Sequence, residues 1–105
     1  MRNTSRNPFI TFFDANVTAG DTSDYFLREE YQLHCIQVIS PATDVSIDIQ
    51  ASNDGATWVK VGDTVVGNKL VQISGLYRYM QVTRTDSEDT ASVTVTCLSG
   101  AKFRK

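Results

Sequence analysis

Asp44-Val-Ser-Ile-Asp-Ile-Gln-Ala51 is the stretch that decides the fold class. Starting at Val45, apolar residues occupy every second position, and polar residues fill the positions between them. In an extended chain a period of two places the apolar side chains on one face and the polar side chains on the other. The segment therefore predicts a β-strand with one buried face and one hydrated face.

The same period recurs along the rest of the chain. Ala91–Leu98 predicts a strand with Val93, Val95 and Cys97 inward and threonines outward, whereas Leu76–Thr85 alternates less cleanly and predicts partial cover on both faces. The shorter strand candidates are Phe9–Phe13, Asp24–Arg28, Gln32–Ile39, Trp58–Val61, Thr64–Val66 and Lys69–Ile73. Turns rich in Gly, Asn and Asp separate them, which is typical of antiparallel sandwiches. We predict an all-β fold, a single antiparallel β-sandwich, jelly-roll-like, with eight or so short strands.

The strongest local turn signal is Ser52-Asn-Asp-Gly-Ala-Thr-Trp58. Asn53 and Gly55 tolerate a positive φ angle, so this segment predicts a sharp hairpin that sets the register of its two strands. Trp58 follows the turn and is expected to cover the end of the core. We interpret the hairpin as a structural device and not as a chemical site.

Length and composition indicate one small globular domain. The chain has 105 residues, of which 41% are hydrophobic and 21% charged. We predict an N-terminal polar and basic arm at residues 1–8, a sandwich domain at residues 9–100 and a basic C-terminal tip at residues 101–105. No apolar run reaches the roughly 20 residues of a membrane span, and no apolar segment follows the N-terminal charges, so neither a membrane span nor a secretory signal is expected.

Charge is distributed unevenly along the chain. All 12 acidic residues lie between Asp14 and Asp89, while half of the 10 basic residues lie in the two terminal segments. An acidic body lacks the clustered cations that nucleic acids require, so we expect no nucleic-acid binding through the folded face. The basic ends are interpreted as solvated tips or, alternatively, as arms that dock on an acidic partner.

Cys35 and Cys97 are the two cysteines, and both stand in apolar stretches. They could pair if their strands are adjacent, but buried reduced thiols are the favoured interpretation, since a secreted disulfide framework normally has four or more cysteines. Neither resembles a metal ligand, because no CxxC spacing is present and His34 is the single histidine.

Residues that could perform catalysis are scarce. His34 lies in the middle of a predicted strand, where a packed or edge histidine is the expected role, and the sequence contains no phosphate-binding GxxxxGK[ST] or GxGxxG motif. Acidic residues gather near Asp86–Asp89, but without the spacing of a calcium loop. We therefore predict a protein that is not an enzyme and that uses no cofactor or metal.

A resemblance adds a biological setting. Ser52-Asn-Asp-Gly55 followed by Trp58, and then Gly75 followed by Arg78-Tyr-Met80 and Val82, resembles short all-β virion proteins of bacteriophages, namely capsid decoration, head-fibre and tail-accessory proteins. The match extends from Val45 to Leu98. The hairpin also resembles that of discoidin-like galactose-binding sandwiches, from which this chain departs in its length and in the positions of its cysteines.

The phage resemblance implies a non-enzymatic virion structural protein, located in the virion and acting through protein–protein contacts as a homo-oligomer bound to other virion proteins. The interface candidates are apolar, aromatic or basic residues: Arg6, Phe9, Phe12, Phe13, Tyr77, Tyr79, Phe103 and Arg104. Alternatively, Phe9–Phe13 is an ordinary first strand. If the arm serves only attachment, deletion of residues 1–8 should leave the melting temperature nearly unchanged.

The alternative function is a carbohydrate-binding module for host glycans. Aromatic rings beside polar loop residues are needed to stack on sugars, and the candidates for that role are Trp58, Tyr25 and Tyr31. The virion-protein and carbohydrate-binding hypotheses differ in where the aromatic side chains point, either into a protein contact or into an exposed groove.

Overall fold

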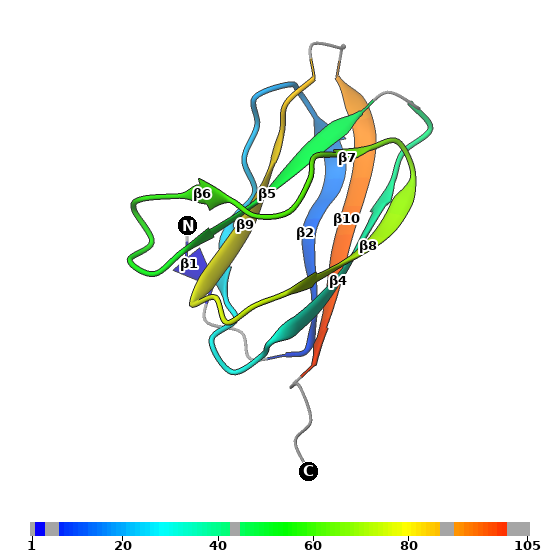
Figure 1. The fold of residues 1–105 in the computed structure, drawn as a ribbon. Coiled ribbons are helices and arrows are strands. Elements are labelled where there is room, and N and C mark those ends of the chain that lie inside the picture. Colours follow the sequence, from blue (N-terminus) through cyan, green and yellow to red (C-terminus); the bar gives the residue numbers. More distant parts are fainter. Residues whose placement is uncertain (1, 4–6, 43–44, 87–89, 101–105) are drawn as a thin grey trace.

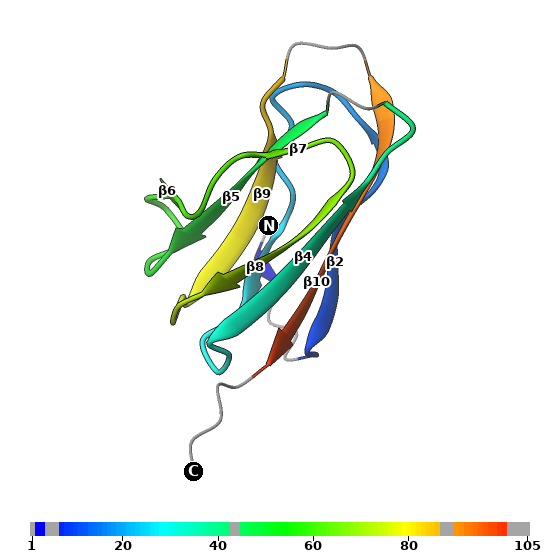
Figure 2. The ribbon, with the colours of Figure 1, turned by 45° about the vertical axis from the view of Figure 1, so that its right-hand side comes forward.

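A computed structural model describes residues 2–3, 7–42, 45–86 and 90–100, and it shows a β-sandwich (Figures 1 and 2). The described strands are β1 (Arg2–Asn3), β2 (Phe9–Val17), β3 (Tyr25–Leu27), β4 (Leu33–Ile39), β5 (Ser46–Ser52), β6 (Val59–Lys60), β7 (Val65–Val66), β8 (Lys69–Ser74), β9 (Tyr79–Arg84) and β10 (Ala91–Gly100). The predicted all-β fold class is confirmed. No helix in the described part of the chain is long and apolar enough to cross a membrane.

The strands form two sheets. One has the order β1-β3-β9-β5-β6, with β7 also paired to β5, and the other has the order β2-β10-β4-β8. Every strand pair is antiparallel except β1 with β3. The chain crosses from one sheet to the other between β2 and β3, and again before β4, β5, β8, β9 and β10. This alternation is compatible with the predicted jelly-roll-like connectivity.

The inner faces of the two sheets enclose the core. In β5 the buried apolar residues are Ile47, Ile49 and Ala51, as the period of two predicts, and in β10 they include Val93 and Val95. The outward residues of these strands are more exposed. Burial of one apolar face from each sheet supplies the main favourable free energy of folding.

A β-bulge changes the predicted role of two aromatic residues. The register between β2 and β10 shifts between Val95 and Thr96, so one extra residue of β2 is accommodated there. As a result Phe12 and Phe13, although adjacent, are both buried in the core, and Phe12 packs edge-on against Phe26 with ring centroids 5.5 Å apart. Prediction of Phe12 and Phe13 as interface residues was therefore wrong, and the alternative of an ordinary first strand holds for them.

Strand β9 is covered on both faces, as its irregular pattern predicts. Five of its six residues are buried, among them Arg84 at its end. The Arg84 guanidinium donates to both carboxylate oxygens of Asp86 over 2.9 and 2.8 Å, and also to the carbonyl of Val17. These bonds satisfy a buried cation with a bidentate carboxylate partner and tie β9 to the end of β2.

The two cysteines are free thiols on neighbouring strands. Cys97 is directly opposite Ile36 in the register, while Cys35 is opposite Leu98. Cys97 points into the core and Cys35, which is half-buried, points to the other face of the sheet. Opposite faces cannot be bridged without backbone movement, so the favoured interpretation of unpaired thiols is confirmed, with burial confirmed for Cys97 alone.

Candidate functional site

The outer face of the four-stranded sheet lacks cover from any other described segment (Figures 1 and 2). Its outward residues, which we call the outer face, are Phe9, Thr11, Asp14, Asn16, Leu33, Cys35, Gln37, Ile39, Leu70, Gln72, Ser74, Ser92, Thr94, Thr96 and Leu98. Five of them expose much of an apolar side chain to solvent: Leu33 37%, Ile39 48%, Phe9 52%, Leu98 57% and Leu70 66%.

Register aligns these side chains in rows across the sheet. One row runs from Phe9 through Leu98 and Cys35 to Gln72, and the next contains Thr96 and Gln37 between Thr11 and Leu70. Among the described residues of the outer face, Asp14 at one end is the single charged side chain. A surface that is both apolar in patches and almost free of charge has the composition of a protein contact surface.

A second cluster of aromatic residues lies on the other sheet. The ring of Tyr25 packs edge-on against Trp58 at 5.2 Å and against Tyr79 at 5.4 Å, and the Arg78 guanidinium lies 5.3 Å from the centre of the Tyr79 ring. Tyr79 is buried by these contacts. Buried side chains cannot contact a partner of the folded chain, so Tyr79 is removed from the set of interface candidates.

The stacking candidates do not form one platform. Tyr25 and Trp58 are half-buried against each other, whereas Tyr31 lies elsewhere and covers the Arg28 guanidinium at 4.7 Å from its ring centre. Tyr77, which we predicted as an interface residue, is half-buried and lines a cleft. Arg6, Phe103 and Arg104 lie outside the described residues.

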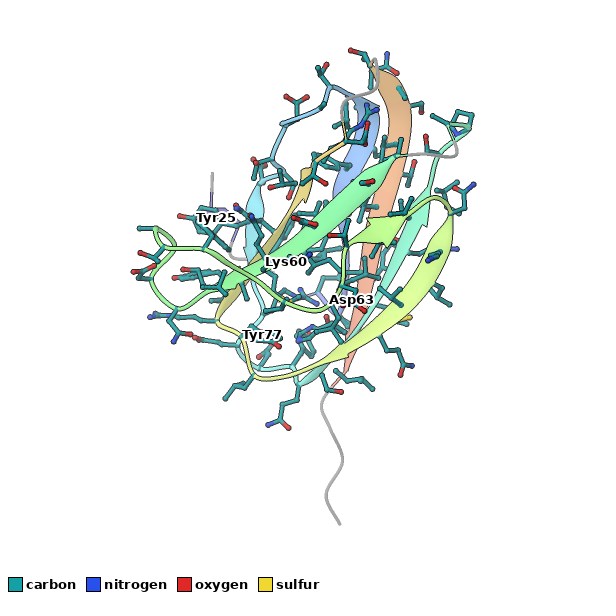
Figure 3. All side chains as sticks on the ribbon, turned by 45° about the horizontal axis from the view of Figure 1, so that its top comes forward. Tyr25, Lys60, Asp63 and Tyr77 are labelled. Atoms are coloured by element: carbon teal, nitrogen blue, oxygen red, sulfur yellow. The ribbon has the colours of Figure 1, made fainter. Side chains whose placement is uncertain are left out.

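This cleft has a volume of about 400 Å³ and opens between the β5–β6 hairpin and the loop that precedes β9 (Figure 3). Its lining residues are Ala51, Ser52, Asn53, Asp54, Thr57, Val59, Val61 and Tyr77. Ala51 and Val61 also belong to the core packing, so the base of the cleft is apolar and its rim is polar. Small-molecule sites in proteins have this volume and this mixture of groups.

Hydrogen bonds fix the hairpin loop that forms the rim. The Ser52 hydroxyl accepts from the backbone N–H of Gly55 over 2.9 Å, and Asp54 Oδ1 accepts from Ala56 N–H over 2.9 Å and Thr57 N–H over 2.8 Å. Donation by Thr57 and Ala56 N–H, with the Ser52 hydroxyl, lowers the pKa of Asp54 to about 2. Asp54 is therefore an anion at every physiological pH.

A buried polar cluster joins β4, the end of β10 and the loop after β8. His34 Nδ1 is 2.9 Å from the Ser99 hydroxyl, and His34 Nε2 is 3.3 Å from the carbonyl of Gly75. Burial lowers the pKa of His34, and burial also raises the pKa of the nearby Cys97 thiol. The carbonyl acceptor places a proton on Nε2 of the neutral ring, so Nδ1 accepts from Ser99. The expected packed histidine is confirmed.

Arg28 connects this region to the N-terminal segment. It is fully buried, and it donates from Nη1 to the carbonyl of Asn7 over 2.9 Å and from Nη2 to the carbonyl of Pro8 over 3.1 Å. Within the described residues Arg28 Nε has no hydrogen-bond partner. The contacts show that residues 7 and 8 belong to the packing of the domain.

Sequence reasoning missed several residues of both surfaces. Leu33, Ile39 and Leu98 on the outer face were interpreted as ordinary strand residues. However, Gln32–Ile39 contains no Asp, Glu, Lys or Arg, which indicates that neither face of this strand is simply hydrated. Asn53 was interpreted only as a turn former. Turn formers at a hairpin tip are also where side chains become free to contact ligands.

The described residues contain no group of three or more His, Cys, Asp or Glu side chains that could hold a metal ion.

Comparisons with known proteins give likeness in fold. No family model and no curated protein matches the chain by sequence. The chain is similar to the SPBc2 prophage-derived protein YomS, with a TM-score of 0.69 and 10% identity over 85% of this chain and 89% of that one. It is also similar to the Yersinia pseudotuberculosis-derived mitogen YPM, with a TM-score of 0.62 and 8% identity over 92% and 89% of the two chains.

A third similar structure is the PBSX exported protein XepA, with a TM-score of 0.63 and 11% identity. That match spans 98% of this chain but 41% of XepA, so the chain corresponds to less than half of that protein. The discoidin-like resemblance is not among these matches. At identities this low the three structures show one thing about the chain, which is that it shares their all-β fold.

Proposed function

We propose that this chain is a non-enzymatic structural protein of a bacteriophage virion and that it acts through protein–protein contacts made by the outer face. The observation that carries the proposal is the near-absence of charge from that face in a chain with 22 charged residues. Phe9, Leu98 and Leu70 would lose apolar surface to a partner, and no unpaired charge other than Asp14 would have to be desolvated.

The setting is supported by the names of two proteins with the same fold. YomS is named as derived from the SPBc2 prophage, and XepA as an exported protein of PBSX. These names agree with the resemblance of the hairpin and the following strand to phage virion proteins. A location in the virion, and capsid decoration, fibre or tail-accessory roles, belong to the proposal.

The size of the outer face favours an assembly with several contacts. Four strands spaced about 4.8 Å apart, each contributing about seven residues at 3.3 Å, give a footprint of roughly 19 by 23 Å. Such a footprint, about 440 Å² per partner, is smaller than the roughly 600–1,000 Å² per partner that a stable isolated interface buries. Repetition around a symmetric particle would make a contact of this size sufficient, because many weak contacts act together.

The self-association part is tested by light scattering at two protein concentrations. We expect the wild-type chain to form an oligomer that Gln37→Lys, a charge placed at the centre of the outer face, converts to a monomer. Thr85→Lys is the matched control, since Thr85 is exposed at the end of β9 and away from this sheet. A monomeric wild-type chain at both concentrations would contradict the homo-oligomer.

The virion part is tested by introducing the same variants into the phage gene and measuring the chain in purified particles by mass spectrometry. Gln37→Lys should be depleted at least tenfold relative to Thr85→Lys, with both proteins folded and equally abundant in infected cells. Equal incorporation of the two variants would contradict the outer face as the contact. Absence of the wild-type chain from purified particles would contradict the proposed function itself.

A further inference from the structure

We infer that the cleft between the β5–β6 hairpin and Tyr77 binds a single neutral sugar residue, with the Tyr77 ring as its stacking surface. This site goes beyond the proposed assembly role and uses other residues. Figures 1 and 2 show the β5–β6 hairpin, which supplies most of the lining, away from β2 and β10, and no lining residue belongs to the outer face, so one copy can use both surfaces. The site also differs from the predicted stacking set of Trp58, Tyr25 and Tyr31.

The rim offers polar groups that the fold itself does not use. Within the described residues, the Asn53 amide, the Thr57 hydroxyl and Asp54 Oδ2 make no hydrogen bond, although all three residues line the cleft. An amide supplies donors and an acceptor, a carboxylate supplies acceptors, and a hydroxyl supplies both. A sugar ring carries several adjacent hydroxyl groups, and this set matches them in kind.

Tyr77 is held in place from behind. Its ring lies 5.9 Å from the ring of buried His34, its hydroxyl donates to the carbonyl of Ser74 over 3.3 Å, and a Cβ at Gly75 would approach the ring to 2.5 Å. Since Gly75 has no side chain, the ring can press against the backbone. A ring fixed in this way loses little conformational freedom when an apolar sugar face packs on it.

The loop opposite Tyr77 is equally preorganised. The Ser52 and Asp54 side chains accept four hydrogen bonds from backbone N–H groups of the loop, and the Ser52 hydroxyl donates to Asp54 Oδ1. The Tyr25 ring contacts Gly55, where an added Cβ would lie 3.2 Å from it. Gly55 has φ of +76°, which a residue with a side chain rarely adopts. Two rigid walls therefore flank an open cleft of about 400 Å³, a volume within the range of small-molecule sites.

Charge selects among possible ligands. Asp54 is ionised, and no cation lines the cleft: the nearby Lys60 pairs with Asp48 at 3.9 Å and Arg78 with Glu29 at 3.3 Å (Figure 3). Phosphorylated, sulfated or carboxylated ligands would meet uncompensated negative charge. Among uncharged ligands, a ring with one apolar face and several hydroxyl groups uses every lining group that the cleft provides.

The experiment is a ¹H–¹⁵N NMR titration of the full chain with methyl α-D-galactopyranoside, methyl α-D-glucopyranoside and, as a cation, choline. At least one glycoside should shift the amide signals of residues 53–61 and 77, with a dissociation constant on the order of 1 mM. Asn53→Ala and Tyr77→Leu should each weaken that binding about tenfold, and Tyr77→Phe, which keeps the ring, should retain it.

Leu76→Ala is the control variant, because Leu76 is 64% exposed beside Tyr77 and does not line the cleft. It should bind like the wild type. Three results would each overturn the inference: no glycoside shifts these signals, choline alone shifts them, or Tyr77→Leu binds as well as Leu76→Ala. The titration needs no phage particle, so its failure is distinct from a failure of virion incorporation.

Discussion

Deletion of residues 1–8 should strongly destabilise the folded domain. The Arg28 guanidinium is fully buried, and its two hydrogen-bond acceptors are the carbonyls of Asn7 and Pro8. Burial lowers the pKa of Arg28, which expresses the cost of keeping its charge out of water. Removal of the segment takes both acceptors from the cation and opens its site to water, so the contribution of residues 7 and 8 exceeds that of a solvated arm.

The magnitude follows from the bonds removed. A hydrogen bond to a charged group contributes roughly 1.5–3 kcal/mol, and the deletion removes two such bonds from Arg28. The deletion also removes the bond from Ser99 N–H to the Pro8 carbonyl at 2.7 Å and the pairing of β1 with β3. Because domains of this size are stable by about 5–15 kcal/mol, the melting temperature should fall by roughly 15–30 °C.

Urea unfolding followed by the fluorescence of Trp58, the single tryptophan, measures the effect. A double-mutant cycle with Arg28→Met separates the guanidinium from the other lost contacts. In the Arg28→Met background the deletion should cost at least about 2 kcal/mol less than in the wild type, since the acceptors no longer serve a cation. Equal costs in both backgrounds, or a deletion without effect, would refute the reasoning and would restore the picture of a separable arm.

Three further predictions concern single sites. The pKa of His34 is lowered in the folded protein, so neutral His34 contributes its full stability above the ordinary pKa of 6.5, and this contribution is lost as pH falls below 6.5. The free energy of unfolding should therefore decrease between pH 7 and 5 by at most about 1.4 kcal/mol per pH unit, and His34→Gln should flatten that slope. In the native protein a thiol reagent should modify Cys35 but not Cys97, and both in denaturant, whereas a disulfide-linked mass would contradict the free thiols. Gly75→Ala should cost about 1–3 kcal/mol because its Cβ meets the Tyr77 ring, and adding Tyr77→Ala should remove most of that cost; an unchanged urea midpoint would refute the clash.

The fold class could be predicted because the period of two is a local property. Asp44–Ala51 and Ala91–Leu98 carry the alternation in full, and the structure has β5 at Ser46–Ser52 and β10 at Ala91–Gly100. The bulge at Val95 and Thr96 could not be predicted in the same way, since it depends on how two distant strands pair. That one extra residue places Phe12 and Phe13 in the core together.

Buried arginines were equally beyond local patterns. Charged residues are expected on the surface, and only the tertiary structure supplies the carbonyls for Arg28 and the carboxylate for Arg84. The candidate sites could be predicted in part, because they combine a local turn pattern with tertiary contacts. The hairpin at Ser52–Trp58 was predicted correctly as a turn, but its use as a cleft wall depends on Tyr77, which comes from a different loop.

The two outward surfaces differ in the kind of contact they can make. The outer face is repetitive and almost uncharged, and its backbone is fixed in the sheet by strands on both sides of β10 and β4. The opposite side carries the ionised Asp54, the Arg78–Glu29 pair and a concave site. Apolar surfaces suit contacts with other proteins, whereas concave polar surfaces suit small ligands. The cleft shares no lining residue with the outer face, which makes sugar recognition and assembly separable by mutation.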